Sequence, residues 1–199
     1  MITEIILNER TDCRVCGANV KQVIDFGSIH INDFPLDPES SPGKAPMVLD
    51  QCVECDLVQL RHTVNPKILY GEHYWYESGL NKKLTDNLID IAEYVNEHTD
   101  KDDIVLDIGA NDGTLLSAVS NDRHRIGCEP APNLIKKLKK NCDEVINDMW
   151  HHDMMQGKKA KAITAIGMFY DMDNPNDLIH SVNESLSDDG IFIAQLMTL

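Results

Sequence analysis

One stretch of the sequence, from Ile104 to Thr114, constrains the fold of this chain more than any other. Its apolar run leads into Asp107 and Gly109, and a second glycine, Gly113, stands where a helical pattern begins. An apolar strand, a glycine-containing turn and a helix in this order are typical of a nucleotide-binding βαβ unit. We therefore expect the second half of the chain to form a helix-covered sheet.

The pattern around this stretch alternates between helix and strand. An amphipathic helix is expected over residues 80–98, with one apolar face made of Leu80, Leu84, Leu88, Ile91 and Val95. Strands are expected at residues 104–108, 125–128, 144–146, 162–168 and 191–196, and helical segments at residues 112–120, 132–140, 150–156 and 176–186. Such alternation predicts an α/β fold, a Rossmann-like parallel sheet. Since the sequence stops after the fifth strand, we expect this sheet to be truncated.

Residues 1–64 carry a second signal, two Cys-x-x-Cys pairs. Cys13 and Cys16 form the first pair, Cys52 and Cys55 the second, and 35 residues lie between the pairs. Two such turns direct four thiolates at one point, which is the closed tetrahedral ligand set of structural zinc. The module has little apolar material for a core, so a metal would supply the missing stability. Two disulfides or unbound thiols are the alternatives.

The sequence predicts three parts: a zinc-binding module (residues 1–64), an aromatic connector with a leading helix (residues 65–100) and the incomplete sheet domain (residues 101–199). Short strand-like pieces are expected in the module at residues 20–26, 47–49 and 57–60, and a helical turn at Asn65-Pro66. The connector contains Tyr74, Trp75 and Tyr76, although only 6% of the chain is aromatic. We interpret this cluster either as a plug between two modules or as a wall or lid of a ligand pocket.

The net charge of −15 narrows the class of partner. It disfavours nucleic acid and anionic membranes and is compatible with a cationic ligand. The sequence has no run of 18 apolar residues and no signal-peptide pattern at its N-terminus, which predicts a cytoplasmic protein without a membrane span.

The turn after the first strand is unusual for a dinucleotide site. Asn111 stands where the G-x-G-x-x-G fingerprint has its middle glycine, and carboxylates flank it at Asp107 and Asp112. These charges would repel a diphosphate and would suit a sulfonium or ammonium group. S-adenosylmethionine is therefore the expected cofactor, and an NAD-dependent oxidoreductase is disfavoured. The candidate cofactor-binding residues of this loop are Asp107, Gly109, Ala110, Asn111, Asp112 and Gly113.

The ends of the second and third strands add further candidates. Glu129 lies 22 residues after Asp107 and is placed to accept from both hydroxyls of a ribose, with Pro130 next to it. Asp148 is placed to accept from the adenine amino group, and Met149 or Trp150 to cover the ring. The alternative for both acids is a surface carboxylate.

These motifs resemble a known family. Asp107, Gly109 and Gly113, followed by Glu129-Pro130, resemble the class I S-adenosylmethionine-dependent methyltransferases. More narrowly, the chain resembles the C-methyltransferases of nucleotide-linked 4-keto deoxysugars, which begin with a zinc-binding domain that carries four cysteine ligands. The stretch from Cys52 to Leu60 matches their C-x-x-C-[GD]-L-V-Q-L motif, and Tyr74 to Gly79 matches their Tyr-x-Tyr-x-Ser-Gly segment.

The resemblance implies methyl transfer to the carbon beside a ketone through an enolate, with a small-molecule nucleotide sugar as substrate. In the family a tyrosine of the aromatic segment lines the sugar site, and Tyr76 is its match. Tyr170 stands after the fourth strand, where the family often has histidine. The family's acid–base residues lie in a segment beyond the length of this chain, so we expect the chain to hold the cofactor half of a site without completing it.

Two other functions are compatible with the same features. One is a methyltransferase of this fold whose zinc module binds RNA or protein, which the net charge of −15 disfavours for RNA. The other is a non-catalytic zinc-ribbon binding or scaffold protein with a degenerate sheet. Failure to bind S-adenosylmethionine would favour the non-catalytic scaffold protein.

Overall fold

The computed structural model describes residues 5–31, 43–71 and 74–196 of the 199-residue chain. The chain divides into two compact units, Met1–Trp75 with Asp173–Pro175, and Tyr76–Met172 with Asn176–Leu199. The boundary after Trp75 runs through the aromatic segment. The division into residues 1–64, 65–100 and 101–199 stays a prediction.

The first unit is built from two small antiparallel sheets. One has the order β2-β3-β4 and the other pairs β1 with β5. Their bounds are Ile6–Glu9 for β1, Val20–His30 for β2, Lys44–Cys52 for β3, Val58–Leu60 for β4 and His62–Val64 for β5. The strand pieces expected from the sequence lie in β2, β3 and β4, with Leu57 just before β4, whereas β1 and β5 were not expected.

A short helix, α1 (Pro66–Leu69), follows β5. The side chain of Asn65 caps it, because Oδ1 accepts from the backbone N–H of Lys67 at 3.0 Å. Pro66 occupies the first helical position, where its missing N–H costs nothing. The helical turn predicted at Asn65-Pro66 is confirmed.

The second unit contains a five-stranded sheet in the order β10-β9-β6-β7-β8, in which every pair is parallel. Its strands are β6 (Ile104–Ile108), β7 (His124–Cys128), β8 (Glu144–Ile146), β9 (Ala160–Ile166) and β10 (Leu186–Gln195). The helices are α2 (Lys82–Glu97), α3 (Thr114–Ala118), α4 (Ile135–Leu138) and α5 (Pro175–Ser185), and the 3₁₀ turns are η2 (Ser78–Leu80), η3 (His152–Met155) and η4 (Phe169–Asp171). The predicted α/β class and the five parallel strands are confirmed.

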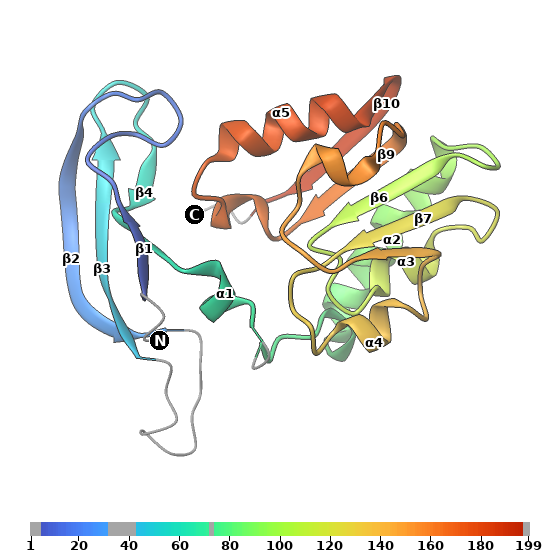
Figure 1. The fold of residues 1–199 in the computed structure, drawn as a ribbon, viewed down its shortest axis with the longest axis horizontal. Helices are drawn as coiled ribbons and strands as arrows, with labels where there is room; N and C mark the ends of the chain where they lie inside the picture. The colour runs from blue at the N-terminus through green and yellow to red at the C-terminus, as the bar shows by residue number, and fades with distance from the viewer. Residues whose placement is uncertain (1–4, 32–42, 72–73, 197–199) are drawn as a thin grey trace. The chain divides into compact units, whose positions relative to one another are not determined.

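Helices cover both faces of this sheet (Figure 1). On one face, α2, α3 and α4 pack against Val105 of β6 and Ala162 of β9. On the other face, α5 packs against Leu106 and Ile108 of β6 and Ile163 of β9. Neighbouring residues of β6 and β9 thus point to opposite cores, which explains why both strands are mainly apolar rather than alternating between apolar and polar residues; the polar residues in them are Asp107, Lys161 and Thr164.

The helix expected over residues 80–98 is α2, but it begins later than predicted. Asn81 is its N-cap, since the side-chain oxygen accepts from the backbone N–H groups of Lys83 and Leu84. Leu80 therefore lies outside the helix and is 78% exposed, so its assignment to the apolar face was wrong. Among the described residues no helix is long and apolar enough to cross a membrane.

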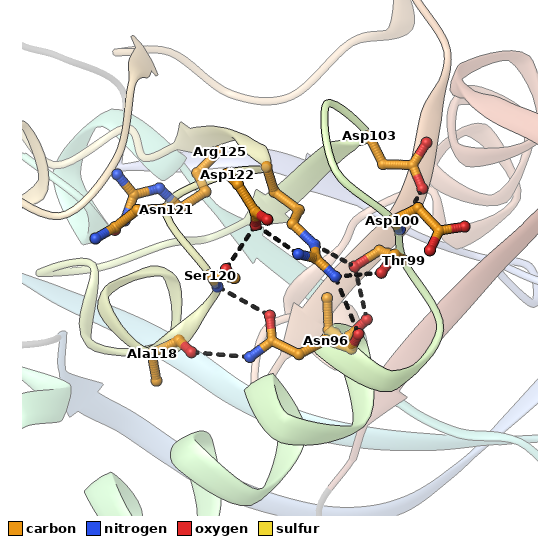
Figure 2. Close-up of polar contacts among 11 residues, drawn as sticks. Asn96, Thr99, Asp100, Asp103, Ala118, Ser120, Asn121, Asp122 and Arg125 are labelled. Atoms are coloured by element: carbon orange, nitrogen blue, oxygen red, sulfur yellow. Dashed lines mark hydrogen bonds and ion pairs between the residues drawn. The ribbon is translucent and has the colours of Figure 1, made fainter.

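Side-chain hydrogen bonds tie the end of α2 to the chain that leads into β7 (Figure 2). Asn96 donates to the carbonyl of Ala118 at 3.1 Å and accepts from the backbone N–H of Ser120 at 2.9 Å. The guanidinium of Arg123 donates to the carbonyls of Asn96 and Thr99. The bonds to the carbonyls of Asn96 and Ala118 satisfy groups that the last turns of α2 and α3 leave without intrahelical partners.

Candidate functional site

The four paired cysteines form a cluster in the first unit. The first turn closes where the backbone N–H of Gly17 donates to the carbonyl of Cys13 at 2.9 Å. The second closes where the N–H of Cys52 donates to the carbonyl of Leu57 at 2.8 Å. Gly17, with φ of 73°, has the left-handed conformation that such a turn requires. The turns bring the Sγ atoms of Cys13, Cys16, Cys52 and Cys55 within 4.8 Å of one another.

The sulfur distances fit a zinc ion. The Sγ atoms of Cys13 and Cys55 are 3.6 Å apart, those of Cys16 and Cys52 3.5 Å, and those of Cys16 and Cys55 3.6 Å. A tetrahedron with Zn–S bonds of about 2.3 Å has edges of about 3.8 Å, whereas a disulfide needs about 2.05 Å. The geometry thus excludes disulfides within this cluster and matches four thiolates around one metal.

Backbone amides favour the thiolate form of Cys52. The N–H groups of Cys55 and Glu54 each donate to its Sγ at 3.4 Å, and the bond from Cys55 has the larger effect in lowering the pKa of the thiol. With four sulfur ligands the site leaves no open position for a substrate, so this chemistry is structural rather than catalytic.

In the second unit, the loop after β6 owes its shape to three residues with left-handed backbone. Gly109, Asn111 and Gly113 have φ angles of 75°, 52° and 81°. Asparagine tolerates this conformation better than most residues, which explains why it can stand where the dinucleotide fingerprint has glycine. A Cβ at Gly113 would lie 2.8 Å from Cβ of Asn141, so only glycine fits there.

Glu129, at the end of β7, is 4% exposed and holds this loop. Its Oε2 accepts from the backbone N–H of Asn111 at 2.9 Å, and its Oε1 accepts from that of Ala131 at 2.8 Å. Burial raises the pKa of the carboxyl, and these two N–H groups oppose that rise. Each carboxylate oxygen keeps a second lone pair, so the side chain can still accept from two hydroxyls of a ligand.

Asp107 is also 4% exposed and bonds to the neighbouring strand. The hydroxyl of Thr164 on β9 donates to its Oδ1 at 2.6 Å. Burial raises the pKa of Asp107 to about 7, and the negative charge of Glu129 adds to that rise. A contact of this carboxyl with a cofactor stays a prediction.

The structure shows a connection that sequence reasoning missed, between the loop and the segment Tyr76–Gly79. The side chain of Asn111 accepts from the N–H of Ser78 at 2.9 Å and donates to the carbonyl of Tyr76 at 3.1 Å. Asp112 accepts from the N–H of Gly79 at 2.9 Å. A Cβ at Gly79 would lie 2.7 Å from that carboxylate oxygen. The glycine at position 79 is therefore the feature of the sequence that could have indicated this close contact.

The side chain of Asp112 is therefore held on both oxygens. Its Oδ1 accepts from the backbone N–H of Thr114 at 3.1 Å and from the hydroxyl at 2.6 Å, while its Oδ2 holds Gly79. Asp112 thus anchors the connector and also accepts the backbone N–H of Thr114, the first residue of α3, whose N-cap is Gly113. Its direct contact with a cofactor, like that of Gly109, Ala110, Asn111 and Gly113, stays a prediction.

The ends of β7 and β8 lie side by side, as the ribose and adenine assignments require. The side-chain amide of Asn147 donates to the carbonyls of Glu129 at 2.9 Å and Pro130 at 3.1 Å. Asp148 is exposed, and its Oδ1 accepts from the N–H of Met149 at 2.8 Å. Met149 itself is partly buried. The structure thus brings Glu129, Pro130, Asp148 and Met149 to one edge of the sheet.

The two tyrosines expected at the substrate lie within electrostatic range of each other. Tyr170 belongs to η4, and burial raises the pKa of its phenol, with smaller contributions from Asp171 and Tyr76. Both rings remain partly accessible to solvent. A tyrosine phenol is protonated at neutral pH, so this group is a hydrogen-bond donor.

The link between loop and connector predicts a measurable change when Asn111 loses its side chain. In the variant Asn111→Gly, which keeps the left-handed backbone free of strain, the amides of residues 76–80 should exchange with solvent about 10-fold faster or more. The reason is that a lost hydrogen bond to a buried group costs about 1–3 kcal/mol. Hydrogen exchange followed by mass spectrometry measures this.

The matched control is Asn87→Ala, since Asn87 is half-buried on α2, its side chain bonds to Gln195, and alanine favours the helix. Its exchange in residues 76–80 should equal that of the unmodified protein. Equal exchange in Asn111→Gly would contradict the anchoring role of Asn111.

Comparison with family models gives two matches that follow one another along the chain. Residues 13–70 match a model described as "Putative zinc binding domain". Residues 76–198, more than half of the chain, match a model described as "Methyltransferase domain". The first match contains all four clustered cysteines, and the second contains the loop after β6 and the whole parallel sheet.

The chain is also similar to individual proteins. It is 26% identical over 198 residues to the C-methyltransferase NovU of Streptomyces niveus, a match that covers 93% of this chain and 47% of NovU. The chain thus spans about half the length of this curated relative.

Solved structures with a similar fold include DesVI of Streptomyces venezuelae, with a TM-score of 0.46 and 20% identity over 59% of this chain and 53% of DesVI. Another is the plantazolicin methyltransferase BamL in complex with SAH, with a TM-score of 0.45 and 21% identity over 54% of this chain and 44% of BamL.

Proposed function

The chain belongs to the methyltransferase family, and we propose from this that it transfers a methyl group from S-adenosylmethionine to carbon. The proposed acceptor is the carbon beside the ketone of a nucleotide-linked keto-deoxysugar. The observation that carries the proposal is the similarity to the C-methyltransferase NovU, which runs through both the cysteine module and the sheet. The acidic loop and the aromatic segment support it.

The residues at the carboxyl edge of the sheet fit this cofactor. The lone pairs that remain on Glu129 suit the two ribose hydroxyls. Asp148 would accept from the adenine amino group and Met149 would cover the ring. The cofactor, when bound, supplies a methyl group made electrophilic by the sulfonium. The other assigned residues of this site are Asp107, Ala110, Asn111, Asp112, Gly113 and Pro130.

The proposed chemistry of the chain's own residues concerns the substrate. When a general base takes the proton beside the ketone, the electron pair of that C–H bond remains in an enolate, whose oxygen takes the negative charge. The enolate carbon would then bond to the methyl group while the bond from methyl to sulfur breaks, and S-adenosylhomocysteine would be the leaving group. Tyr170, whose pKa is raised by burial, would donate its phenolic proton in a hydrogen bond to that oxygen. Tyr76 would line the sugar site, held in place through the bond from Asn111 to its carbonyl.

The zinc ion proposed at the four cysteines has no part in this chemistry. Its thiolate ligands are closed around it, and its role is to stabilise the first unit.

The test has two independent readouts. Calorimetry should detect binding of S-adenosylmethionine to the full chain. Because the acid–base residues of the family are expected outside this chain, imidazole is added as an external base. Incubation with nucleoside-diphosphate keto-deoxysugars and imidazole in D2O should then show deuterium uptake beside the ketone and, with labelled cofactor, a new carbon-bound methyl group by NMR. Tyr170→Phe should slow deuterium uptake and methyl transfer about 100-fold or more, since one hydrogen-bond donor to a developing oxyanion accelerates a reaction about 100- to 1000-fold.

Tyr94→Phe is the matched control, because Tyr94 lies on α2, is exposed and stacks on His98. Its rates should be unchanged. If the cofactor binds and no keto sugar exchanges its proton, the substrate proposal fails while the cofactor proposal stands. If the cofactor does not bind, the function as a methyltransferase is contradicted for this chain.

A further inference from the structure

A cluster of imidazole and carboxylate groups lies apart from every residue used above, at the start of η3. His151, His152 and Asp153 each offer one ligand atom, and the three atoms lie within 4.8 Å of one another. Nδ1 of His151 is 3.1 Å from Oδ2 of Asp153, and Nε2 of His152 is 3.4 Å from Oδ1 of the same side chain. The two oxygens of one carboxylate thus each face an imidazole nitrogen. Nδ1 of His151 also accepts from the backbone N–H of Asp153 at 3.4 Å, a contact that a bound ion would replace.

From this geometry we propose that His151, His152 and Asp153 form a second metal site, which binds a divalent transition-metal ion. Bonds of about 2.0–2.1 Å from zinc to nitrogen or oxygen give a separation of about 3.3–3.4 Å between neighbouring ligand atoms. The two distances between imidazole and carboxylate, one to each oxygen of Asp153, are close to that separation. Two imidazoles with one carboxylate favour zinc, nickel, cobalt or copper over magnesium and calcium, which prefer oxygen ligands.

The surroundings of His152 match those of a metal-binding histidine. Its Nδ1 lies 3.4 Å from the hydroxyl of Ser181 on α5, and Ser181 is 4% exposed. If Nδ1 carries the proton and donates to this hydroxyl, the lone pair of Nε2 points toward Asp153. Metal-bound histidines nearly always use their other ring nitrogen in this way, which fixes the orientation of the ring. The ring of His180 packs edge-on against His152 at 5.6 Å and further limits its rotation.

The rest of the coordination sphere would come from water. Asp153 is 80% exposed and His151 is exposed as well, so solvent reaches the side of the cluster opposite to Ser181. This arrangement differs from the cysteine cluster, whose four ligands leave no position open. The site does not rest on the proposed methyl transfer, because none of its three residues has a part in it.

The test uses the full chain with its cysteines already loaded with one equivalent of zinc, titrated with nickel chloride in a calorimeter. Nickel should bind in one further equivalent. The variant with both His151→Ala and His152→Ala should bind nickel more than about 10-fold more weakly, a lower limit set by the effect of losing only a supporting group around a metal. The zinc content and the circular dichroism of the variant should be unchanged, which shows that it is folded.

The matched control is the variant with both His98→Ala and His124→Ala, since these histidines lie outside the cluster, at the end of α2 and on β7. Its affinity for nickel should equal that of the unmodified protein. The proposal is overturned if the unmodified chain takes up no nickel beyond its zinc, or if the variant at His151 and His152 binds nickel as tightly as the control.

Discussion

Replacing Cys52 by serine is expected to abolish zinc binding and to unfold the first unit. The metal carries much of that unit's stability, because binding of structural zinc to small domains is worth about 10–16 kcal/mol. The apolar core of the unit is small. Among its described residues the buried apolar side chains are Cys13, Ile31, Ala45, Val48 and Cys52. Two of these five are themselves ligands of the proposed zinc.

Two measurements check this expectation. Metal analysis should find about one zinc per chain in the unmodified protein, in buffer without added metal, and none in Cys52→Ser. Hydrogen exchange should show loss of protection in β2, β3 and β4 of the variant, while β6 and β9 of the second unit stay protected.

Cys142→Ser is the matched control. Cys142 lies in the second unit, and its Sγ bonds to the carbonyls of Leu138 and Glu144 at 3.3 Å, contacts that a hydroxyl can replace. This variant should keep its zinc. A Cys52→Ser protein with one zinc and a fully protected β3 would refute the structural role of the metal.

Replacing Glu129 by glutamine is expected to weaken binding of S-adenosylmethionine about 100-fold or more. A hydrogen bond to a charged acceptor is worth about 1.5–3 kcal/mol, and the ribose assignment gives Glu129 two of them. Glutamine keeps the size of the side chain but offers one acceptor oxygen in place of two. One of the N–H groups of Asn111 and Ala131 then also loses its acceptor, which loosens the loop itself.

Calorimetry with S-adenosylmethionine measures the loss of affinity. A thermal unfolding curve of the variant shows whether the protein is still folded. Glu144→Gln is the matched control, since Glu144 lies on the neighbouring β8 and pairs with Lys158 and His124. The control should bind with unchanged affinity. Unchanged affinity in Glu129→Gln would contradict the ribose assignment.

The elements of the second unit were readable from the sequence because they follow local patterns. The predicted strands at residues 104–108 and 144–146 coincide with β6 and β8, since each is a short apolar run next to a turn. The predicted ends of the helices were less accurate. The segment expected at residues 132–140 is reduced to α4, Ile135–Leu138, and α2 begins after its cap at Asn81. Capping depends on single side chains, which periodicity does not register.

The sequence alone determined the parallel α/β class of the second unit, the four clustered cysteines and the acidic loop between β6 and α3. These depend on residue type and spacing along the chain, which fix the local turns and the face that each side chain presents. Only the tertiary structure decided the partners of the polar groups. Asn111 and Asp112 hold the segment Tyr76–Gly79, and His152 meets Ser181 of α5. Such pairs join residues about 30 positions apart, and hydrogen bonds form only where folding has already placed donor and acceptor within about 3 Å of each other.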